Sequence, residues 1–304
     1  MFRLLVTQFK KLFQSPLFYC SILAVTILCS FSELSNNFNS NALEGEGDVI
    51  VSCLSRYTGE QIQSDISFCA YNVFSVGGSG KWMQLFIPVL AAIAAINIFL
   101  DEREYREKRL TIFRIGKKKY YIGNILFFLI TGVLVAVLGY FLFAVYANIC
   151  FPGFHNYSKD MVDEYIKSDL NSGTLIGKVY ASHGLFAVYG LQFVSFGMYG
   201  VMSVLPAMLL SAFVRNKYII ACIPFFLFDV LRQISTVFLI KGTSNLDDYD
   251  YYNKISTYLS PGSVIKLFEL GEYMKMVAIV WMVLILAFSI LTFIIMGLGV
   301  DKGE

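Results

Sequence analysis

Charged side chains are scarce in this chain. Asp, Glu, Lys and Arg make up 15% of its 304 residues, whereas they make up about a quarter of an average soluble domain. Hydrophobic residues make up 57% of the sequence. A water-soluble globule has no use for so much apolar surface, so lipid is the expected solvent. The formal net charge of +2, with no basic stripe between stacking aromatics, excludes nucleic acid as a partner.

Groups that support catalysis are also few. The two histidines, His155 and His183, have no His-Glu-x-x-His or Cys-x-x-Cys partner, so no metal site is expected. No Gly-x-Ser-x-Gly elbow occurs. The run from Gly77 to Trp82 resembles half a phosphate loop, but position 75 is Ser and Trp82 replaces the required Ser or Thr. We expect no enzyme active site and no cofactor in this chain, and we interpret the glycines as a hinge.

Long apolar runs are what the sequence has instead. Six of them can cross about 30 Å of hydrocarbon at about 1.5 Å per helical residue. The sequence therefore predicts one all-α polytopic membrane domain over residues 1–304, with six transmembrane helices at about 17–32, 82–100, 120–150, 185–214, 218–240 and 276–300.

The distribution of Lys and Arg predicts the orientation of these helices. With the N-terminus inside, the short inner segments hold 14 basic residues, and the outer segments 33–81, 151–184 and 241–275 hold nine in about three times the length. Basic residues concentrate on the cytoplasmic side of membrane proteins. Both chain ends are therefore predicted to be cytoplasmic.

Residues 1–16 are predicted to form an amphipathic helix that lies in the interface. Phe2, Leu5 and Phe9 share one face, Gln8 lies elsewhere, and Pro16 separates the helix from the first span. A simple extension of that span is one alternative. A cleaved secretory leader that ends at Ser30-Phe31-Ser32 is another.

The first outer segment is rich in Asn, Ser and Gly and is predicted to form a small extracellular subdomain. Cys53 and Cys69 are its only cysteines. A disulfide is a candidate for two cysteines on an oxidising face, and it would stabilise the loop by about 3 kcal/mol. Two unlinked thiols are the alternative.

Asp229, Arg232 and Gln233 place charge near the middle of the fifth predicted span. The first two are separated by three residues, so they share a helical face and can neutralise each other. Charges at this depth face protein or a water-filled cavity, because lipid does not solvate them. The trio is a candidate for the translocation path or a subunit interface, and a structural bridge to a neighbouring helix is the alternative.

Small residues recur along single helical faces and predict close helix packing. One such face could instead form the subunit interface. The three sets are Gly132, Ala136 and Tyr140, with Gly139 alongside; Gly200, Ser203, Ala207 and Ser211; and Ala91 with Ala95.

The segment 101–119, DEREYREKRLTIFRIGKKK, lies between the second and third predicted spans. The positive-inside rule explains its basic residues but not its four acidic ones. A short apolar patch follows the charges, and Gly116 precedes a basic re-entry into the membrane. We expect a short helix below the bilayer that docks into a soluble partner.

This layout resembles the ABC-2 type permeases, the membrane subunits of ABC exporters. The resemblance rests on the six spans, the N-terminal helix, the turn at Gly116-Lys117, the run Tyr120-Tyr121-Ile122-Gly123-Asn124 and the element Tyr258-Leu259-Ser260-Pro261. Asn124 departs from the family, where Gly-Lys is usual. In the family the loop after the second span is the coupling helix. The residues assigned to ATPase coupling are Glu102, Arg103, Glu104, Arg106, Arg109, Ile112, Phe113 and Gly116.

The resemblance implies a permease that exports a peptide, a drug-like molecule or an amphiphile across a bacterial cytoplasmic membrane. Its partners would be a separate ABC ATPase that binds ATP and Mg, and a second copy or a paralogue of the permease. A secondary transporter and a membrane assembly or sensor protein are the alternatives. Six spans without an inverted repeat count against the first of these.

Overall fold

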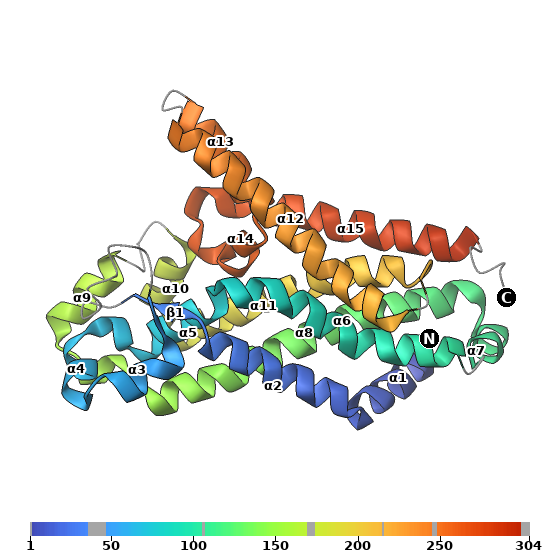
Figure 1. The fold of residues 1–304 in the computed structure, drawn as a ribbon, viewed down its shortest axis with the longest axis horizontal. Helices are drawn as coiled ribbons and strands as arrows, with labels where there is room; N and C mark the ends of the chain where they lie inside the picture. The colour runs from blue at the N-terminus through green and yellow to red at the C-terminus, as the bar shows by residue number, and fades with distance from the viewer. Residues whose placement is uncertain are drawn as a thin grey trace.

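The computed structural model describes residues 2–35, 47–104, 107–168, 174–214, 216–244 and 248–298. The described residues form five long helices, and all but one of them, which runs obliquely, lie roughly along one axis (Figure 1). They are α6 (Lys81–Glu104), α8 (Lys117–Cys150), α11 (Leu185–Leu210), α12 (Lys217–Ser244) and α15 (Met274–Leu298). Each of the five is long and apolar enough to span a membrane.

Two shorter helices at the N-terminus, α1 (Phe2–Gln14) and α2 (Pro16–Ser30), form a pair bent by 67°. Pro16 cannot donate a backbone hydrogen bond, and Ser15 before it is extended, with φ −81° and ψ 123°. The predicted break is confirmed. Leu12 on the predicted apolar face of α1 is buried, and Leu5 and Phe9 pack against the core, but Gln8, which was expected on the polar side, is fully buried as well.

The outer segments form a helical subdomain at the end of the molecule opposite α7 (Glu107–Ile115) (Figure 1). Two antiparallel two-residue strands open it, and they are the only sheet among the described residues. Its elements are β1 (Glu33–Leu34), β2 (Asp48–Val49), α3 (Ile50–Arg56), α4 (Gly59–Ser64), the 3₁₀ turns η2 (Ile66–Phe68) and η3 (Phe154–Asn156), α5 (Ala70–Ser79), α9 (Lys159–Ser168) and α10 (Leu175–His183).

Helix α5 was not predicted, and it changes the role of the glycines near its end. Gly77 and Gly78 lie inside α5, where a Cβ would come within 2.1 Å of the Phe143 ring and 2.7 Å of the Tyr140 hydroxyl. They allow α5 to pack closely against α8. The break before α6 is at Gly80, so the hinge is one residue long.

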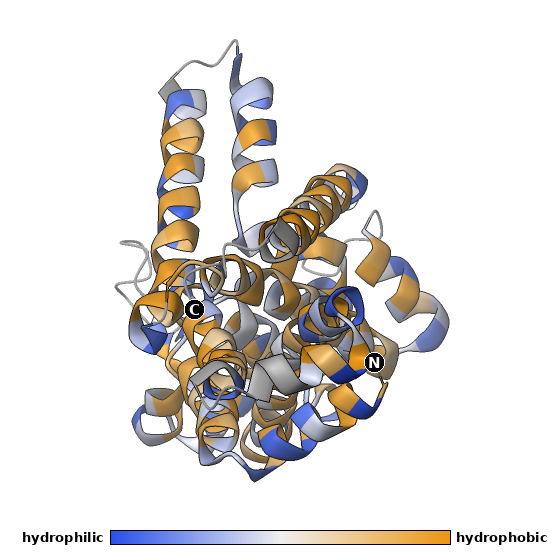
Figure 2. Ribbon diagram, turned by 90° about the vertical axis from the view of Figure 1, so that its right-hand side faces the viewer, coloured by the Kyte–Doolittle hydropathy of each residue, from blue (hydrophilic) through white to orange (hydrophobic). Residues whose placement is uncertain are grey.

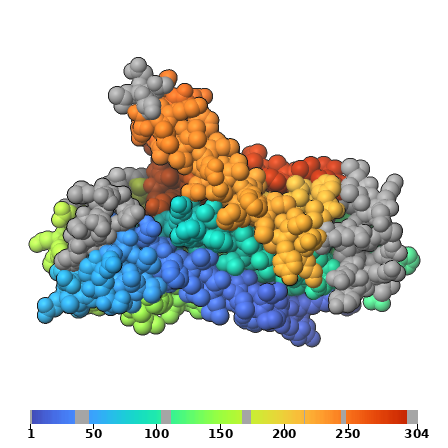
Figure 3. Space-filling view, viewed as in Figure 1, coloured from blue at the N-terminus to red at the C-terminus, as the bar shows by residue number. Residues whose placement is uncertain are grey.

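Helix α12 leaves the bundle in its second half and pairs with α13 (Tyr249–Leu259), as Figures 2 and 3 show. The Ser235 hydroxyl lies 3.0 Å from both the backbone oxygen and the hydroxyl of Ser256, and both serines are buried. The chain then returns through α14 (Gly262–Ile265), η5 (Leu267–Glu269) and η6 (Gly271–Tyr273). Val264 and Leu267 are buried in this return.

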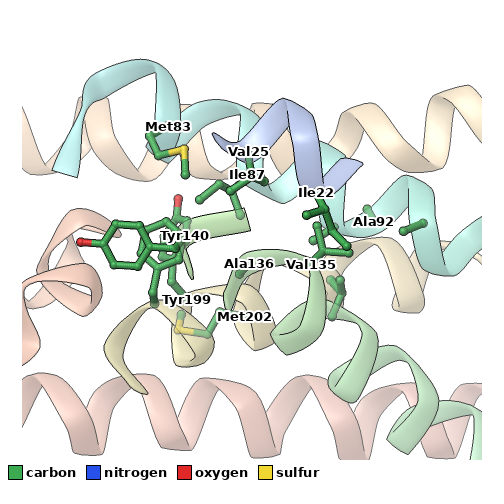
Figure 4. Close-up of a cluster of buried hydrophobic side chains, with 14 of the residues drawn as sticks. Ile22, Val25, Met83, Ile87, Ala92, Val135, Ala136, Tyr140, Tyr199 and Met202 are labelled. Carbon is green, nitrogen blue, oxygen red and sulfur yellow. The ribbon is translucent and has the colours of Figure 1, made fainter. Parts of the chain in front are cut away.

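The core lies where α2, α6 and α11 pack around α8. Apolar side chains of all four helices meet there, including Ile22, Ile87, Ala136 and Met202 (Figure 4). Where α8 crosses α11, a Cβ on Gly132 would lie 2.4 Å from the Gly200 backbone oxygen. This crossing is the close packing that the small-residue faces predict.

The described chain is therefore an all-α multi-pass membrane protein with a minimal two-stranded sheet. It has five spanning helices, or six if the bent pair is one span. Helix α2 has only 15 residues and is too short to count alone. Helix α11 ends at Leu210, four residues before the predicted end of the span, and Pro206 lies inside it.

Candidate functional site

Helix α7 stands at one end of the molecule, where α1 begins and α15 ends (Figure 1). It is followed by Gly116, whose φ of +89° is in the left-handed region that favours glycine. Phe113 is 94% exposed, while Ile112 and Ile115 are half-buried against the core. The helix and the turn that the sequence predicts are present, and α8 begins directly after the turn.

The residues assigned to ATPase coupling differ in how much of each the structure describes. Ile112, Phe113 and Gly116 lie in and directly after α7, and Glu102 lies in α6. Arg103, Glu104 and Arg109 are on helical backbone, but the structure does not describe their side chains. Arg106 lies outside the described residues.

Glu102 is not accessible to a partner protein, because only 6% of this residue is exposed. The Gln8 side-chain amide donates to Glu102 Oε2 at 3.3 Å and to Asn124 Oδ1 at 2.6 Å. The Asn124 amide donates in turn to the Tyr120 backbone oxygen at 3.1 Å. We call Gln8, Glu102 and Asn124 the polar node; it joins α1, α6 and α8.

Ion pairs extend these connections. Lys11 Nζ lies 3.8 Å from Glu102 Oε1, so α1 contacts this carboxylate through two side chains. Lys217 Nζ at the start of α12 lies 2.5 Å from Asp101 Oδ1. Hydrogen bonds to a buried charged group stabilise by about 1.5–3 kcal/mol, whereas exposed ion pairs contribute about 0–1 kcal/mol. The polar node is therefore the stronger connection.

Asp229, Arg232 and Gln233 come together on α12 as the sequence predicts. Arg232 donates to Asp229 Oδ1 at 2.8 Å, and Gln233 donates to Asp229 Oδ2 at 2.6 Å. The Arg232 and Asp229 side chains are 31% and 24% exposed. In the apolar 18-residue stretch of α12 only 17% of the residues are buried, whereas 67% are buried in the corresponding stretches of α6 and α11. Within the described chain this polar trio therefore lies on a sparsely covered helix.

The predicted disulfide between Cys53 and Cys69 is wrong, because all six cysteines are thiols. The Cys53 thiol donates to the Val49 backbone oxygen, whereas the Cys69 sulfur accepts from the Asn72 N–H as the N-cap of α5. The two belong to separate apolar clusters, so helix packing holds them apart. Burial, with the nearby Asp48 carboxylate, raises the pKa of Cys53 to about 11.

A polar network among α5, α11 and η5 was not predicted. Gln192 Nε2 donates to the Tyr71 hydroxyl at 3.2 Å and to Glu269 Oε1 at 3.3 Å, and the Ser75 hydroxyl donates to the same oxygen at 3.4 Å. The signal in the sequence was Gln192, an amide side chain within the fourth predicted span. Such groups need partners in the membrane, but the sequence does not identify those partners.

Neither histidine belongs to a group of potential metal ligands within the described residues. His155 lies on η3, and His183 ends α10.

No protein-family model matches the sequence, and no curated protein matches it. The polar node, the exposed Phe113 and the polar trio on α12 are therefore the features from which a function can be argued.

Proposed function

We propose that this chain is the membrane-spanning subunit of an ATP-driven exporter of the ABC-2 type. The observation that carries the proposal is α7, a short helix outside the bundle that carries an almost fully exposed Phe113. An aromatic side chain that is exposed to water suits insertion into a pocket of a soluble partner. In this proposal the partner is a separate ATPase, which binds ATP and Mg.

Movement of α7 would reach the membrane helices through contacts at their ends. The turn at Gly116 joins α7 to α8, and the polar node holds α8, α6 and α1 together. The Lys217–Asp101 ion pair connects the start of α12 to α6. A displacement of α7 would therefore be transmitted to α8, α6, α1 and the start of α12.

The polar trio supports a second permease subunit as a partner. Charged side chains within a spanning helix normally face protein or water rather than lipid. In a single chain α12 is sparsely covered and its trio is partly exposed. A second copy or a paralogue would cover the trio, or would form a polar path with it.

The membrane is proposed to be a bacterial cytoplasmic membrane, with α7 and both chain ends inside. The density of Lys and Arg around α7 supports this orientation. The cargo is proposed to be a peptide, a drug-like molecule or an amphiphile.

The test is co-purification with the ATPase encoded by a neighbouring open reading frame. We expect the wild-type chain to retain it and Phe113→Asp to lose most of it, because a carboxylate would enter an apolar contact. Phe186→Asp is the matched control, since Phe186 is 90% exposed on α11 and lies away from α7. Retention of the ATPase by Phe113→Asp at the wild-type level contradicts the proposed docking site.

A second experiment tests coupling rather than docking. The charge reversals Glu104→Arg and Arg109→Glu, combined, are expected to reduce ATP hydrolysis in the purified complex. Unchanged hydrolysis contradicts the coupling role. Transport that continues without any ATPase and follows a proton or sodium gradient would favour a secondary transporter.

A further inference from the structure

Helices α6 and α12 pack against each other in opposite directions. Phe225 on α12 contacts Phe86 on α6, with ring centroids 5.6 Å apart. One turn further along α12, the Asp229 carboxylate interacts electrostatically with the Lys81 ammonium. Lys81 is the first residue of a helix that is long and apolar enough to span a membrane. The surface along this helix pair therefore reaches one edge of the membrane.

Exposed aromatic side chains line this surface below Lys81. The Trp82 ring stacks with the Phe86 ring one turn away, with centroids 6.2 Å apart. Trp82 is 50% exposed, and Phe86 is partly exposed as well. Tryptophan is enriched where hydrocarbon meets the headgroups, because its ring is apolar and its N–H is polar. An acyl chain that lies along these rings would cover them.

The charges at the top of the surface leave an excess of positive charge. Arg232 donates to Asp229 Oδ1 at 2.8 Å, but its Nε–H has no hydrogen-bond partner within the described residues. Lys81 is exposed, and its Nζ lies 5.9 Å from the centre of the Trp82 ring. Two cations and one carboxylate give one net positive charge beside an unused N–H donor. This combination complements an anion that accepts hydrogen bonds.

The positions on α12 separate this surface from the one offered to a second subunit. Phe225, Asp229 and Arg232 are at i, i+4 and i+7, so they share the face next to α6. Gln233 lies on the neighbouring exposed face with Val230, which is half-exposed. A second copy can therefore cover Gln233 while the face next to α6 remains available.

We propose that Lys81, Trp82, Phe86 and Arg232 bind a phospholipid. Its phosphate would accept from the Lys81 ammonium and the Arg232 guanidinium, and its acyl chain would lie along Trp82 and Phe86. A free phosphate would gain nothing from the aromatic rings. The inference goes beyond the proposed function and needs neither the ATPase nor a second subunit, so the two proposals fail separately.

The test uses the fluorescence of Trp82 as its readout. The chain has two tryptophans, and Trp281 is only 3% exposed. Trp281→Phe therefore leaves Trp82 as the single reporter, and the wild-type chain gives the same comparison with smaller amplitude if that variant does not fold. Phosphatidylglycerol with brominated acyl chains is added to the full chain in detergent micelles, where bromine quenches a tryptophan that it contacts.

Brominated diacylglycerol is the matched probe, since it has the same chains without the phosphate. We expect half-maximal quenching of Trp82 at an at least about tenfold lower fraction of the phospholipid than of the diacylglycerol. High salt should reduce this preference, because the contact lies at an exposed edge.

Two variants locate the phosphate. Lys81→Gln removes an exposed charge, and we expect it to remove most of the preference for the phospholipid. Lys178→Gln is the matched control, since Lys178 is an exposed lysine on α10, outside this surface. Arg232→Gln is expected to reduce the preference as well, and Lys81→Gln keeps the test decisive if Arg232→Gln does not fold.

Four results would overturn the proposal. The first is equal quenching by the two brominated lipids, and the second is an equal effect of Lys81→Gln and Lys178→Gln. The third is relief of quenching by inorganic phosphate, which would assign the charges to a free anion. The fourth is a dimeric chain in which neither lipid quenches Trp82, which would assign this surface to a second copy.

Discussion

The Gln8 side-chain amide donates a hydrogen bond to Glu102, a residue 94 positions further along the chain. Its second bond, to Asn124 at 2.6 Å, brings in a third helix. All three side chains are buried. Gln8, which the sequence places on the polar face of α1, thus connects α1 to α6 and α8.

Replacement of Glu102 by Ala is expected to lower the free energy of unfolding by about 2–3 kcal/mol, because buried partners lose a charged acceptor. Asp101→Ala is the matched control. It breaks a half-exposed ion pair with Lys217 and should cost less than about 1 kcal/mol. Denaturant unfolding in mixed micelles measures both. Equal losses would mean that the polar node contributes no more than a surface pair.

The crossing of α8 and α11 should not tolerate a larger side chain. In Gly200→Ala the new Cβ would lie 2.4 Å from the Gly132 backbone oxygen, and we expect a loss of about 1–3 kcal/mol from overpacking. Gly190→Ala, in the same helix, adds its methyl to open space and should be neutral or slightly stabilising. The apparent unfolding temperatures of the purified variants test this difference. A Gly200→Ala variant as stable as Gly190→Ala would contradict the close approach.

Asp229→Ala leaves the Arg232 guanidinium on α12 without its carboxylate. We expect less assembled complex and less transport, because an unneutralised charge is poorly solvated in a membrane helix. The double variant Asp229→Ala with Arg232→Ala should recover part of the assembly. Size-exclusion chromatography and vesicle transport measure the two effects. Wild-type behaviour of both single variants in both assays would show that the trio serves neither purpose.

The raised pKa of Cys53 predicts a pH dependence of stability. Below about pH 9 the thiol is protonated in both the folded and the unfolded chain, so its contribution is constant. Between pH 9 and about pH 11 the unfolded chain loses its proton first, so the contribution of the protonated thiol to folding is lost as pH rises. The difference in unfolding free energy between the wild type and Cys53→Ala should therefore narrow over this range. A constant difference from pH 8 to pH 11.5 would contradict the shift.

Local composition was sufficient to predict the membrane class and most of the long helices. An apolar run of about 20 residues forms a helix in lipid whatever its neighbours are, because its backbone groups must bond within the segment. Pro16 and Gly116 likewise act through their own backbone geometry. These features depend on a few adjacent residues, and the sequence displays them directly.

The relations between distant residues were decided only when the helices packed. Gln8 on α1 is buried because α1 packs against α6 and α8. No local pattern in the sequence predicts this burial. Cys53 and Cys69 share one short segment, yet Cys53 packs in the main core, whereas Cys69 packs in a second cluster with Tyr157 and Tyr165. Composition sets which segments enter the membrane, whereas shape and hydrogen-bond complementarity between helices set which side chains meet.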